Sequence, residues 1–238
     1  MRGVRGRVVA VTGAAGGIGA AICSRLVDDG AVVVALDRRD SEFGRSSVVD
    51  VTDPASVRTA VADILDVEGR VDAFVAAAGV VEDDVAAENM TLDQWDAVMG
   101  VNLRGLFLCN QAFAAPMLAA GRGTIVNISS MSGNHVVNVP QKQCAYNASK
   151  AAVTALTKSL ASEWASRGVR VNSVAPGYVS TPLLAQKKHQ FAEWLAATPQ
   201  GRMADPSEIA SVVAFLVSDE SGYFCGSELL VDGGYSLR

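Results

Sequence analysis

No apolar run in this sequence approaches the roughly 18 residues that a membrane-spanning helix needs. The first residues, Met1 to Arg7, also lack the apolar segment of a secretory signal peptide. We therefore expect a protein with no membrane partner and a cytoplasmic location.

The sequence also lacks the spacing of a metal site. Its cysteines are far apart, form no C-x-x-C pair, and lie near neither histidine in the sequence. Zinc sites typically draw on closely spaced cysteine and histidine ligands. The sequence therefore predicts free thiols and no metal site for the four cysteines, Cys23, Cys109, Cys144 and Cys225.

A stripe of basic side chains is missing too. Lysine and arginine are scattered along a chain with a formal net charge of -5 and a pI near 5.1, which argues against a nucleic-acid partner. Internal repeats and low-complexity linkers are also absent. With 238 residues, half of them apolar, the chain can bury one large core, so we expect residues 1–238 to form a single domain that binds small molecules.

What the sequence does contain is an alternation of short β-branched runs with helical patterns. This alternation predicts an α/β fold: a Rossmann-like, doubly wound parallel sheet of about seven strands with helices on both faces. Only twelve residues separate Asp37 from Asp50, so the crossover there must be a loop or a very short helix. Strands are expected at 7–12, 31–36, 71–79, 124–128, 169–174 and 229–231, and helical segments at 92–120, 146–166, 183–197 and after Asp205-Pro206.

The first expected strand runs directly into a glycine-rich turn and then a helix. Glycine lets the backbone turn sharply and approach a pyrophosphate, whose charge is met by the free N–H groups at the helix start. A glycine-rich turn without a ligand is the plainer alternative, but strand, glycines and helix in this order favour a dinucleotide. The predicted cofactor-binding residues of the turn are Gly13, Gly16, Gly17, Ile18 and Gly19.

The second expected strand ends at Asp37, eighteen residues beyond Gly19. A carboxylate there can accept hydrogen bonds from the adenosine ribose hydroxyls and would repel a 2′-phosphate, so the sequence favours NAD over NADP. Arg38 and Arg39 keep the alternative open, because an arginine beside the ribose can accommodate that phosphate.

Tyr146 and Lys150 are spaced to share one face of a helix. The pKa of tyrosine is roughly 10, and lowering it to about 7 needs roughly 4 kcal/mol of stabilisation of the phenolate. An ammonium about 4 Å away supplies about 4 kcal/mol at an effective dielectric of about 20. We therefore expect Lys150 to lower the pKa of Tyr146. An ordinary surface pair is the alternative.

Ser130 follows the expected strand 124–128. Ligands of open α/β sheets bind outside the carboxyl ends of the strands, so a hydroxyl at this place is well positioned for chemistry. A serine that only caps a turn would be the commoner interpretation if Tyr146 were not expected nearby.

These segments resemble the short-chain dehydrogenase/reductase family over nearly the whole chain. The residues that carry the resemblance are the turn Thr12-Gly13-x-x-x-Gly17-x-Gly19, the four residues Asn102, Ser130, Tyr146 and Lys150, in the order and approximate spacing of the family's catalytic tetrad, and Pro176-Gly177. The resemblance implies NAD as cofactor and a secondary alcohol or ketone as substrate. It also implies a homo-oligomer, a dimer or tetramer built on the helix of Tyr146 and the helix before it.

The resemblance further implies a role for each residue. Tyr146 would be the general acid/base, Ser130 would orient the substrate oxygen, and Lys150 would lower the tyrosine pKa and hold the nicotinamide ribose. Asn102 would position a water in a proton relay, and Thr181 would hold the carboxamide. The other implied cofactor contacts are Asp50, Val51, Ala78, Gly79, Pro176, Gly177 and Val179, and the segment 183–203 is expected to be a substrate lid.

One departure from the family pattern lies at the end of the fourth strand. The family usually has two asparagines there, whereas this chain has Ala76 and Ala77. The side-chain hydrogen bonds of that strand must be lost or made differently.

A second departure is the loop between the serine and the tyrosine, which is a little longer than usual because Tyr146 follows Ser130 by sixteen residues. Its sequence is similar to that of the sugar-alcohol (polyol) dehydrogenase branch. The predicted substrate residues are Ser130, Ser132, Asn138 and Tyr146, with His135 and Gln141 as further hydrogen-bonding groups of the same loop. The alternative is that these side chains only hold the loop's own backbone.

Three functions stay open from the sequence. The favoured one is an NAD-dependent oxidoreductase acting on a polyol or sugar. The second is an NADPH-dependent ketone or 3-oxoacyl reductase, against which Asp37 is the main evidence. The third is a dinucleotide-binding sensor without activity, which the presence of Tyr146 and Lys150 argues against.

Overall fold

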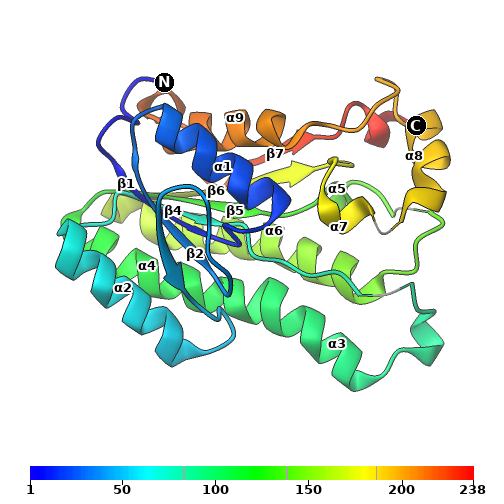
Figure 1. The fold of residues 1–238 in the computed structure, drawn as a ribbon, viewed down its shortest axis with the longest axis horizontal. Coiled ribbons are helices and arrows are strands. Elements are labelled where there is room, and N and C mark those ends of the chain that lie inside the picture. Colours follow the sequence, from blue (N-terminus) through cyan, green and yellow to red (C-terminus); the bar gives the residue numbers. More distant parts are fainter. Residues whose placement is uncertain (83, 138, 186) are drawn as a thin grey trace.

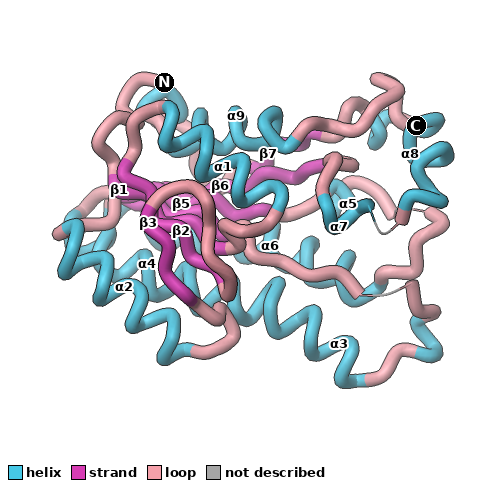
Figure 2. The backbone as a smooth tube through the Cα atoms, viewed as in Figure 1, coloured by secondary structure: helices cyan, strands magenta, loops and turns pink. Residues whose placement is uncertain are grey.

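The computed structural model describes residues 1–82, 84–137, 139–185 and 187–238, with the side chain of Leu183 left aside. Its described strands form one parallel sheet in the order β3-β2-β1-β4-β5-β6-β7 (Figures 1 and 2). The strands are β1 Val8–Thr12, β2 Val32–Asp37, β3 Arg45–Val48, β4 Ala73–Ala76, β5 Gly123–Ile128, β6 Val169–Pro176 and β7 Glu228–Val231. The predicted α/β sheet of about seven strands is therefore confirmed.

Helices cover both faces of the sheet, as Figure 1 shows. Side chains alternate between the faces of a strand, so Val8 and Ala10 of β1 pack into one core and Val9 and Val11 into the other. The first core is completed by α2 Pro54–Glu68, α4 Leu106–Ala120 and α6 Cys144–Trp164. The second core is completed by α1 Gly17–Asp28 and α9 Pro206–Val217.

Local sequence explains where several helices begin. Asp53 accepts hydrogen bonds from Ala55 and Ser56 and is followed by Pro54, which suits the first helical position. The helix α3 Leu92–Met99 starts with a capping box, and so does α9, where Asp205 and Glu208 exchange bonds across the first turn. The helix predicted after Asp205-Pro206 is thus confirmed.

The crossover between β2 and β3 is a loop at 38–44, which agrees with the short spacing there. The segment 92–120 is not one regular helix, because the π-helical turn Gly100–Gly105 separates α3 from α4. Asn102 lies in this turn. Single π-helical turns inside helices are frequent at functional sites.

The single helix predicted at 183–197 is wrong. The chain forms three short pieces instead: α7 Pro182–Ala185, a 3₁₀ turn Lys188–Gln190 and α8 Phe191–Ala197. The interruption turns the chain so that Trp194, which is fully buried, stacks on Tyr178 with ring centroids 4.3 Å apart. A third apolar cluster around these rings, including Met131, replaces the continuous amphipathic helix.

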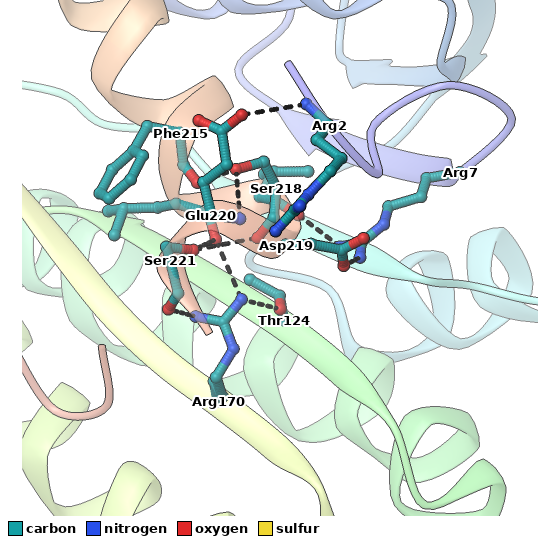
Figure 3. A network of polar contacts seen from close by, with 11 residues as sticks. Arg2, Arg7, Thr124, Arg170, Phe215, Ser218, Asp219, Glu220 and Ser221 are labelled. Atoms are coloured by element: carbon teal, nitrogen blue, oxygen red, sulfur yellow. Dashed lines mark hydrogen bonds and ion pairs between the residues drawn. The ribbon is translucent and has the colours of Figure 1, made fainter. Parts of the chain in front are cut away.

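A polar network ties the amino ends of the strands to the end of α9 (Figure 3). Arg7, just before β1, donates to the carbonyl of Val217 and pairs with Asp219. Arg170 of β6 donates to the carbonyl of Ser221 at 2.9 Å and to Thr124 Oγ1 at 2.9 Å. These arginines satisfy backbone carbonyls at and just beyond the carboxyl end of α9, where cations are favoured.

In the part of the chain that the structure describes, no helix combines the length and the apolar character needed to cross a membrane. The same residues contain no cluster of three or more histidine, cysteine or acidic side chains able to hold a metal ion.

Candidate active site

A pocket opens at the carboxyl ends of the strands, at the side of the sheet where Figure 1 places α5 (Met131–Asn134) and α7. Open α/β sheets bind their ligands at this edge. Residues from seven separate segments of the chain meet there. Among the predicted site residues, those that line the pocket are Ile18, Gly79, Ser130, Ser132, Tyr146, Lys150, Pro176, Gly177, Val179 and Thr181.

Tyr146 and Lys150 lie one turn apart at the start of α6 and both face the pocket. Lys150 is almost fully buried, and its Nζ donates a 2.8 Å hydrogen bond to the carbonyl of Ile128. The same Nζ lies 5.7 Å from the centroid of the Tyr146 ring. Burial lowers the pKa of Lys150 to about 8, because an ammonium loses its hydration there.

The expected fall in the pKa of Tyr146 is not found. Burial raises the pKa of Tyr146, a hydrogen bond with Ser130 opposes this, and the negative charge of Glu82 raises it further. The physical reason is the place of the ammonium: Lys150 bonds the carbonyl of Ile128 and lies over the phenol ring. Its charge is therefore not directed at the hydroxyl.

Ser130 caps a turn and also lies in the pocket beside Tyr146. It follows β5 directly and its side chain accepts a hydrogen bond from the backbone N–H of Ser132, so it caps the short helix α5. Its Oγ also lies 3.0 Å from Ser132 Oγ and bonds the Tyr146 hydroxyl. The two serines and the tyrosine thus form one hydroxyl cluster in the pocket wall.

Asn102 is fully buried behind the pocket and does not line it. Its side-chain oxygen accepts from the N–H of Val80, and its amide donates to the carbonyl of Val80, both at 2.8 Å. The amide also donates to Ser149 Oγ at 3.1 Å, which in turn donates to the carbonyl of Tyr146 at 2.7 Å. Asn102 therefore joins the loop after β4 to the first turn of α6.

The glycine turn between β1 and α1 requires glycine for close packing. Gly13 has a φ of +70°, and a Cβ there would lie 2.6 Å from the backbone nitrogen of Ala78. A Cβ on Gly19 would lie 2.0 Å from the carbonyl oxygen of Gly13, and one on Gly17 would lie 2.8 Å from Thr181 Cγ2. The turn thus lies directly against the ends of β4 and β6, at the edge of the pocket.

The start of α1 fits the pyrophosphate of a dinucleotide. Gly16 caps the helix without a side-chain hydrogen bond, and the first turn contains no acidic side chain. The N–H groups of this turn therefore have no anionic side chain as a partner within their own turn, as a phosphate site requires. Gly17 and Ile18, the first residues of α1, bring this end of the helix to the pocket.

Asp37 ends β2 next to the glycine turn. One carboxylate oxygen accepts the N–H of Ala15 at 3.1 Å, and the other accepts the N–H of Arg39 at 3.1 Å. Arg39 donates to the carbonyl of Ala15 at 3.2 Å. Asp37, which is predicted to bind the adenosine ribose, is therefore held in place by backbone hydrogen bonds, one of them from the glycine turn.

Asp50 and Val51 lie beyond β3. The hydroxyl and the N–H of Thr52 each donate a hydrogen bond to Asp50 and lower its pKa, and the charge of Arg38 lowers it further. Val51 packs against the π-helical turn, since a Cβ on Gly105 would lie 3.0 Å from Val51 Cγ2. Neither residue lines the catalytic pocket, so a cofactor role would place them at its adenine end.

One part of the pocket lining is polar. Ser132, Gln141, Gln143 and Lys187 line it, with Leu184 as an apolar member from α7. The Nζ of Lys187 is shielded from solvent and makes no hydrogen bond within residues 1–82, 84–137, 139–185 and 187–238. The predicted residue Asn138 lies outside the described residues.

The prediction that His135 is a hydrogen-bonding group of the substrate loop does not fit the structure. Its Nε2 lies 2.9 Å from a carboxylate oxygen of Glu228 in β7, and it does not line the pocket. The same carboxylate accepts from Ser129 at 2.6 Å. His135 thus anchors the loop to the sheet.

Sequence reasoning missed Glu82, which lies in the loop after β4 and is only 7% exposed. Its carboxylate accepts hydrogen bonds from the N–H groups of Ala145 and Tyr146. The signal was present in the sequence: no capping side chain precedes the helix at Cys144, so its first N–H groups need an acceptor from elsewhere.

The fold and pocket agree with the family comparison. Residues 13–236 match the family model described as "Enoyl-(Acyl carrier protein) reductase". The chain therefore belongs to the short-chain dehydrogenase/reductase family, as the sequence motifs predicted, and it is an oxidoreductase. Members of this family bind a nicotinamide dinucleotide.

Three known proteins show how similar the chain is to its relatives. Galactitol 2-dehydrogenase (L-tagatose-forming) of Cereibacter sphaeroides is 42% identical over 98% of this chain and 96% of its own. The 3-oxoacyl-(acyl-carrier-protein) reductase of Vibrio cholerae serotype O1 is 38% identical over 97% of this chain and 98% of its own. The ligand-free structure of Thermoplasma acidophilum aldohexose dehydrogenase has a TM-score of 0.92 at 34% identity, covering 99% of this chain and 96% of that one.

Proposed function

We propose that this enzyme interconverts a secondary hydroxyl of a polyol and the corresponding ketose, using NAD, with Tyr146 as the general acid/base. The observation that carries the proposal is the hydroxyl cluster of Tyr146, Ser130 and Ser132, which lies in one pocket with Lys150 and the cofactor-side residues. A pocket of this kind can hold a substrate oxygen between two hydroxyls while a proton moves.

The chain's own residues would have the following roles in the reaction. Ser130 holds the substrate oxygen, and Tyr146 takes its proton during oxidation or returns it during reduction. Lys150 is placed to bond a ribose hydroxyl, and its Nζ is a close neighbour of Gly79, because a Cβ there would lie 3.5 Å away. A bound nicotinamide would supply the hydride acceptor or donor. Pro176, Gly177 and Thr181 would hold its ring.

We propose that Asp37 makes the enzyme prefer NAD to NADP. Its carboxylate lies beside the glycine turn and would repel a 2′-phosphate. Arg39 bonds the carbonyl of Ala15, which supports a structural role for this arginine. A higher kcat/KM for NADP than for NAD would show that the two arginines decide the cofactor instead.

The polyol is supported by the polar wall of the pocket and by similarity to a galactitol dehydrogenase. Ser132, Gln141 and Lys187 offer hydrogen-bonding groups beyond the reacting hydroxyl. A buried polar group that stays unpaired costs about 1 to 3 kcal/mol. Ser132 and Gln141 already bond Ser130 and Tyr178, whereas the Nζ of Lys187 has no recorded partner among the described residues. A further substrate hydroxyl could pair with this Nζ, so a vicinal diol or polyol should be preferred to a mono-alcohol of equal length.

The second candidate is an NADPH-dependent reductase of ketones or 3-oxoacyl groups. Similarity to the 3-oxoacyl reductase of Vibrio cholerae and the presence of Arg38 favour it. A screen of polyols, sugars, secondary alcohols and oxoacyl thioesters with both cofactors separates the candidates. Oxidation of polyols with NAD supports the first, and reduction of oxoacyl thioesters with NADPH alone would replace it with the second.

The role of Tyr146 is tested by Tyr146→Phe. Loss of a general acid/base should lower kcat by a factor of about 10² to 10⁴, while the Kd for NAD stays near that of the parent. Tyr223→Phe is the matched control, because Tyr223 is fully exposed and far from the pocket lining. Near-normal turnover by the Tyr146 variant would refute the assignment.

We further propose a homo-oligomer, a dimer or tetramer, built on α4 and α6. Both helices present apolar side chains in a shallow groove between them, among them Phe107 and Leu156. The lid at 183–203 and the cytoplasmic location remain predictions from the sequence.

A further inference from the structure

The helix that carries Tyr146 begins without a cap of its own. α6 starts at Cys144, and the side chain of the preceding Gln143 makes no capping hydrogen bond. The first N–H groups of a helix have no partner within the helix and carry its positive end. An acceptor from another part of the chain is therefore required to order the first turn.

Glu82 supplies this acceptor from the loop after β4. One carboxylate oxygen accepts the N–H of Ala145 at 3.0 Å, and both oxygens lie 3.1 Å from the N–H of Tyr146. Among the described residues no cation forms a salt bridge with Glu82. Within the part of the chain that the structure describes, the buried carboxylate is thus satisfied by the helix end, including the backbone of Tyr146.

The same loop is fixed from a second side. Val80 exchanges two 2.8 Å hydrogen bonds with Asn102. The Asn102 amide donates to Ser149, and the Ser149 hydroxyl donates to the carbonyl of Tyr146. The N–H of Tyr146 is held by Glu82 and its carbonyl is held through Ser149. Both ends of this one residue are therefore tied to the segment 80–82, which directly follows Gly79 in the pocket lining.

We propose that Glu82 is a positioning residue for the reaction: its carboxylate fixes the first turn of α6, and thereby Tyr146, against the loop that borders the cofactor side of the pocket. The proposal rests on the proposed function of Tyr146. It assigns to Glu82 two separable effects, one from its hydrogen bonds and one from its charge.

The charge acts on the proton that Tyr146 exchanges. Among the described residues, the charged groups that line the pocket with the phenol or act on it are Lys150 on its own helix, Glu82 on the loop after β4, and Lys187 on the segment after α7. The side chains of Ser130 and Ser132, from the β5 side, are neutral. Of these charges only that of Glu82 opposes loss of the proton, and it raises the pKa of Tyr146.

Two substitutions separate position from charge. Glu82→Gln keeps an oxygen that can accept a hydrogen bond from the helix end but removes the negative charge. Glu82→Ala removes both. Asp84→Asn is the matched control, because Asp84 lies in the same loop and accepts the N–H of Lys142 at 2.6 Å, before the helix begins.

For oxidation, kcat/KM should be measured against pH in all variants. Removing the negative charge lowers the pKa of Tyr146, so the acid limb of the profile should move to lower pH in Glu82→Gln, with kcat at the plateau within about threefold of the parent. Glu82→Ala should lose about 10- to 100-fold in kcat, since misplacing a catalytic group by a fraction of an ångström is costly. Both variants should bind NAD as the parent does, and Asp84→Asn should match the parent in every measurement.

A second readout needs no substrate. The ultraviolet absorbance of the Tyr146 phenolate, taken as the difference between each protein and its Tyr146→Phe counterpart, should appear at lower pH in Glu82→Gln than in the parent. An unchanged phenolate titration together with unchanged kcat in Glu82→Ala would overturn the proposal. If no alcohol is oxidised by the parent, the proposed function fails, but the phenolate titration still decides whether Glu82 acts on Tyr146.

Discussion

At the scale of single residues, the site combines groups whose burial is costly. Lys150 is the clearest case, because an almost fully buried ammonium has only one described hydrogen-bond acceptor, the carbonyl of Ile128. No carboxylate forms a salt bridge with it in the described chain. The burial of this side chain therefore costs stability, as that of functional groups often does.

We expect Lys150→Met to stabilise the cofactor-free protein while abolishing turnover. The pKa of Lys150 is lowered from 10.5 to about 8 in the folded protein, so the unfolded chain binds more protons between these values. Stability of the parent should rise with pH through this window, and the cost should be fully present below about pH 8. The variant should lack this rise and gain on the order of 2 kcal/mol at pH 7.

Urea unfolding at several pH values checks the effect of Lys150→Met. Lys158→Met is the control, since Lys158 lies on an exposed part of the same helix. Parallel stability curves for the parent and Lys150→Met across pH 8 to 10 would contradict the argument.

Lys187 is the second lysine of the pocket. Its shielded Nζ makes no hydrogen bond with any residue that the structure describes, and the residue lines the pocket. If a hydroxyl of the polyol accepts from this ammonium, Lys187→Met should raise KM for the polyol by about 10- to 100-fold, the range of one hydrogen bond to a charged group. KM for a mono-alcohol should change far less.

The neighbouring lysine provides the comparison for this prediction. Lys188 is exposed and does not line the pocket, so Lys188→Met should behave as the parent. Equal losses for polyol and mono-alcohol in Lys187→Met would leave the lysine with a role in holding the segment after α7. A rise in KM for NAD alone would assign it to the cofactor.

At the scale of elements, the glycine turn before α1 shows why backbone shape decides cofactor binding. Gly13→Ala places a methyl group 2.6 Å from the backbone of Ala78 at a φ of +70°. The turn must shift away from β4, so we expect the Kd for NAD to rise at least about tenfold, or about 1.4 kcal/mol. Fluorescence titration of NADH measures this directly.

Gly6→Ala is the matched control for the turn. Gly6 has a similar φ of +74°, but a Cβ there has no atom within 4 Å. This substitution should lower stability by roughly 1 to 2 kcal/mol through strain alone and leave the Kd for NAD unchanged. A similar loss of affinity in both variants would show that strain, and not the contact with Ala78, is responsible.

The elements also show what the sequence could and could not predict. β1 and β4 are buried along their whole length, so their apolar runs identified them, and the Asp205-Pro206 cap identified the start of α9. The break in the segment 182–197 was not predicted, because its apolar residues follow the helical period. The break accompanies the stacking of Trp194 on Tyr178, a residue outside this segment.

The candidate site likewise has features that the sequence could predict and features that it could not. Tyr146, Lys150 and Ser130 were predictable because spacing along one element, or the end of a strand, determines their place. The pKa shift of Tyr146 was not predictable. It depends first on burial, then on the hydrogen bond with Ser130 and on the charge of Glu82, and all three arise only in the tertiary fold.

At the scale of the whole molecule, the face formed by α4 and α6 carries apolar side chains in a groove. Leu156 and the more exposed Phe107 line a groove between the two helices, and Leu118 and Leu160 continue it. Full burial of a leucine or phenylalanine stabilises an interface by about 1.5 to 3 kcal/mol. A second copy packed on this face would also fix α6, the helix that carries Tyr146.

We therefore expect the parent to be a dimer or tetramer by light scattering at micromolar concentration, and the double substitution Phe107→Glu with Leu156→Glu to yield monomers. The new carboxylates would have to lose their hydration in the interface, at a cost larger than the contacts supply. Val67→Glu is the control, because Val67 is an exposed apolar residue on α2, outside the groove.

Oligomers that survive the double substitution would place the interface elsewhere, and a monomeric parent would refute assembly itself. If the dissociated variant also loses kcat while its Kd for NAD stays constant, assembly on α6 contributes to the placement of Tyr146.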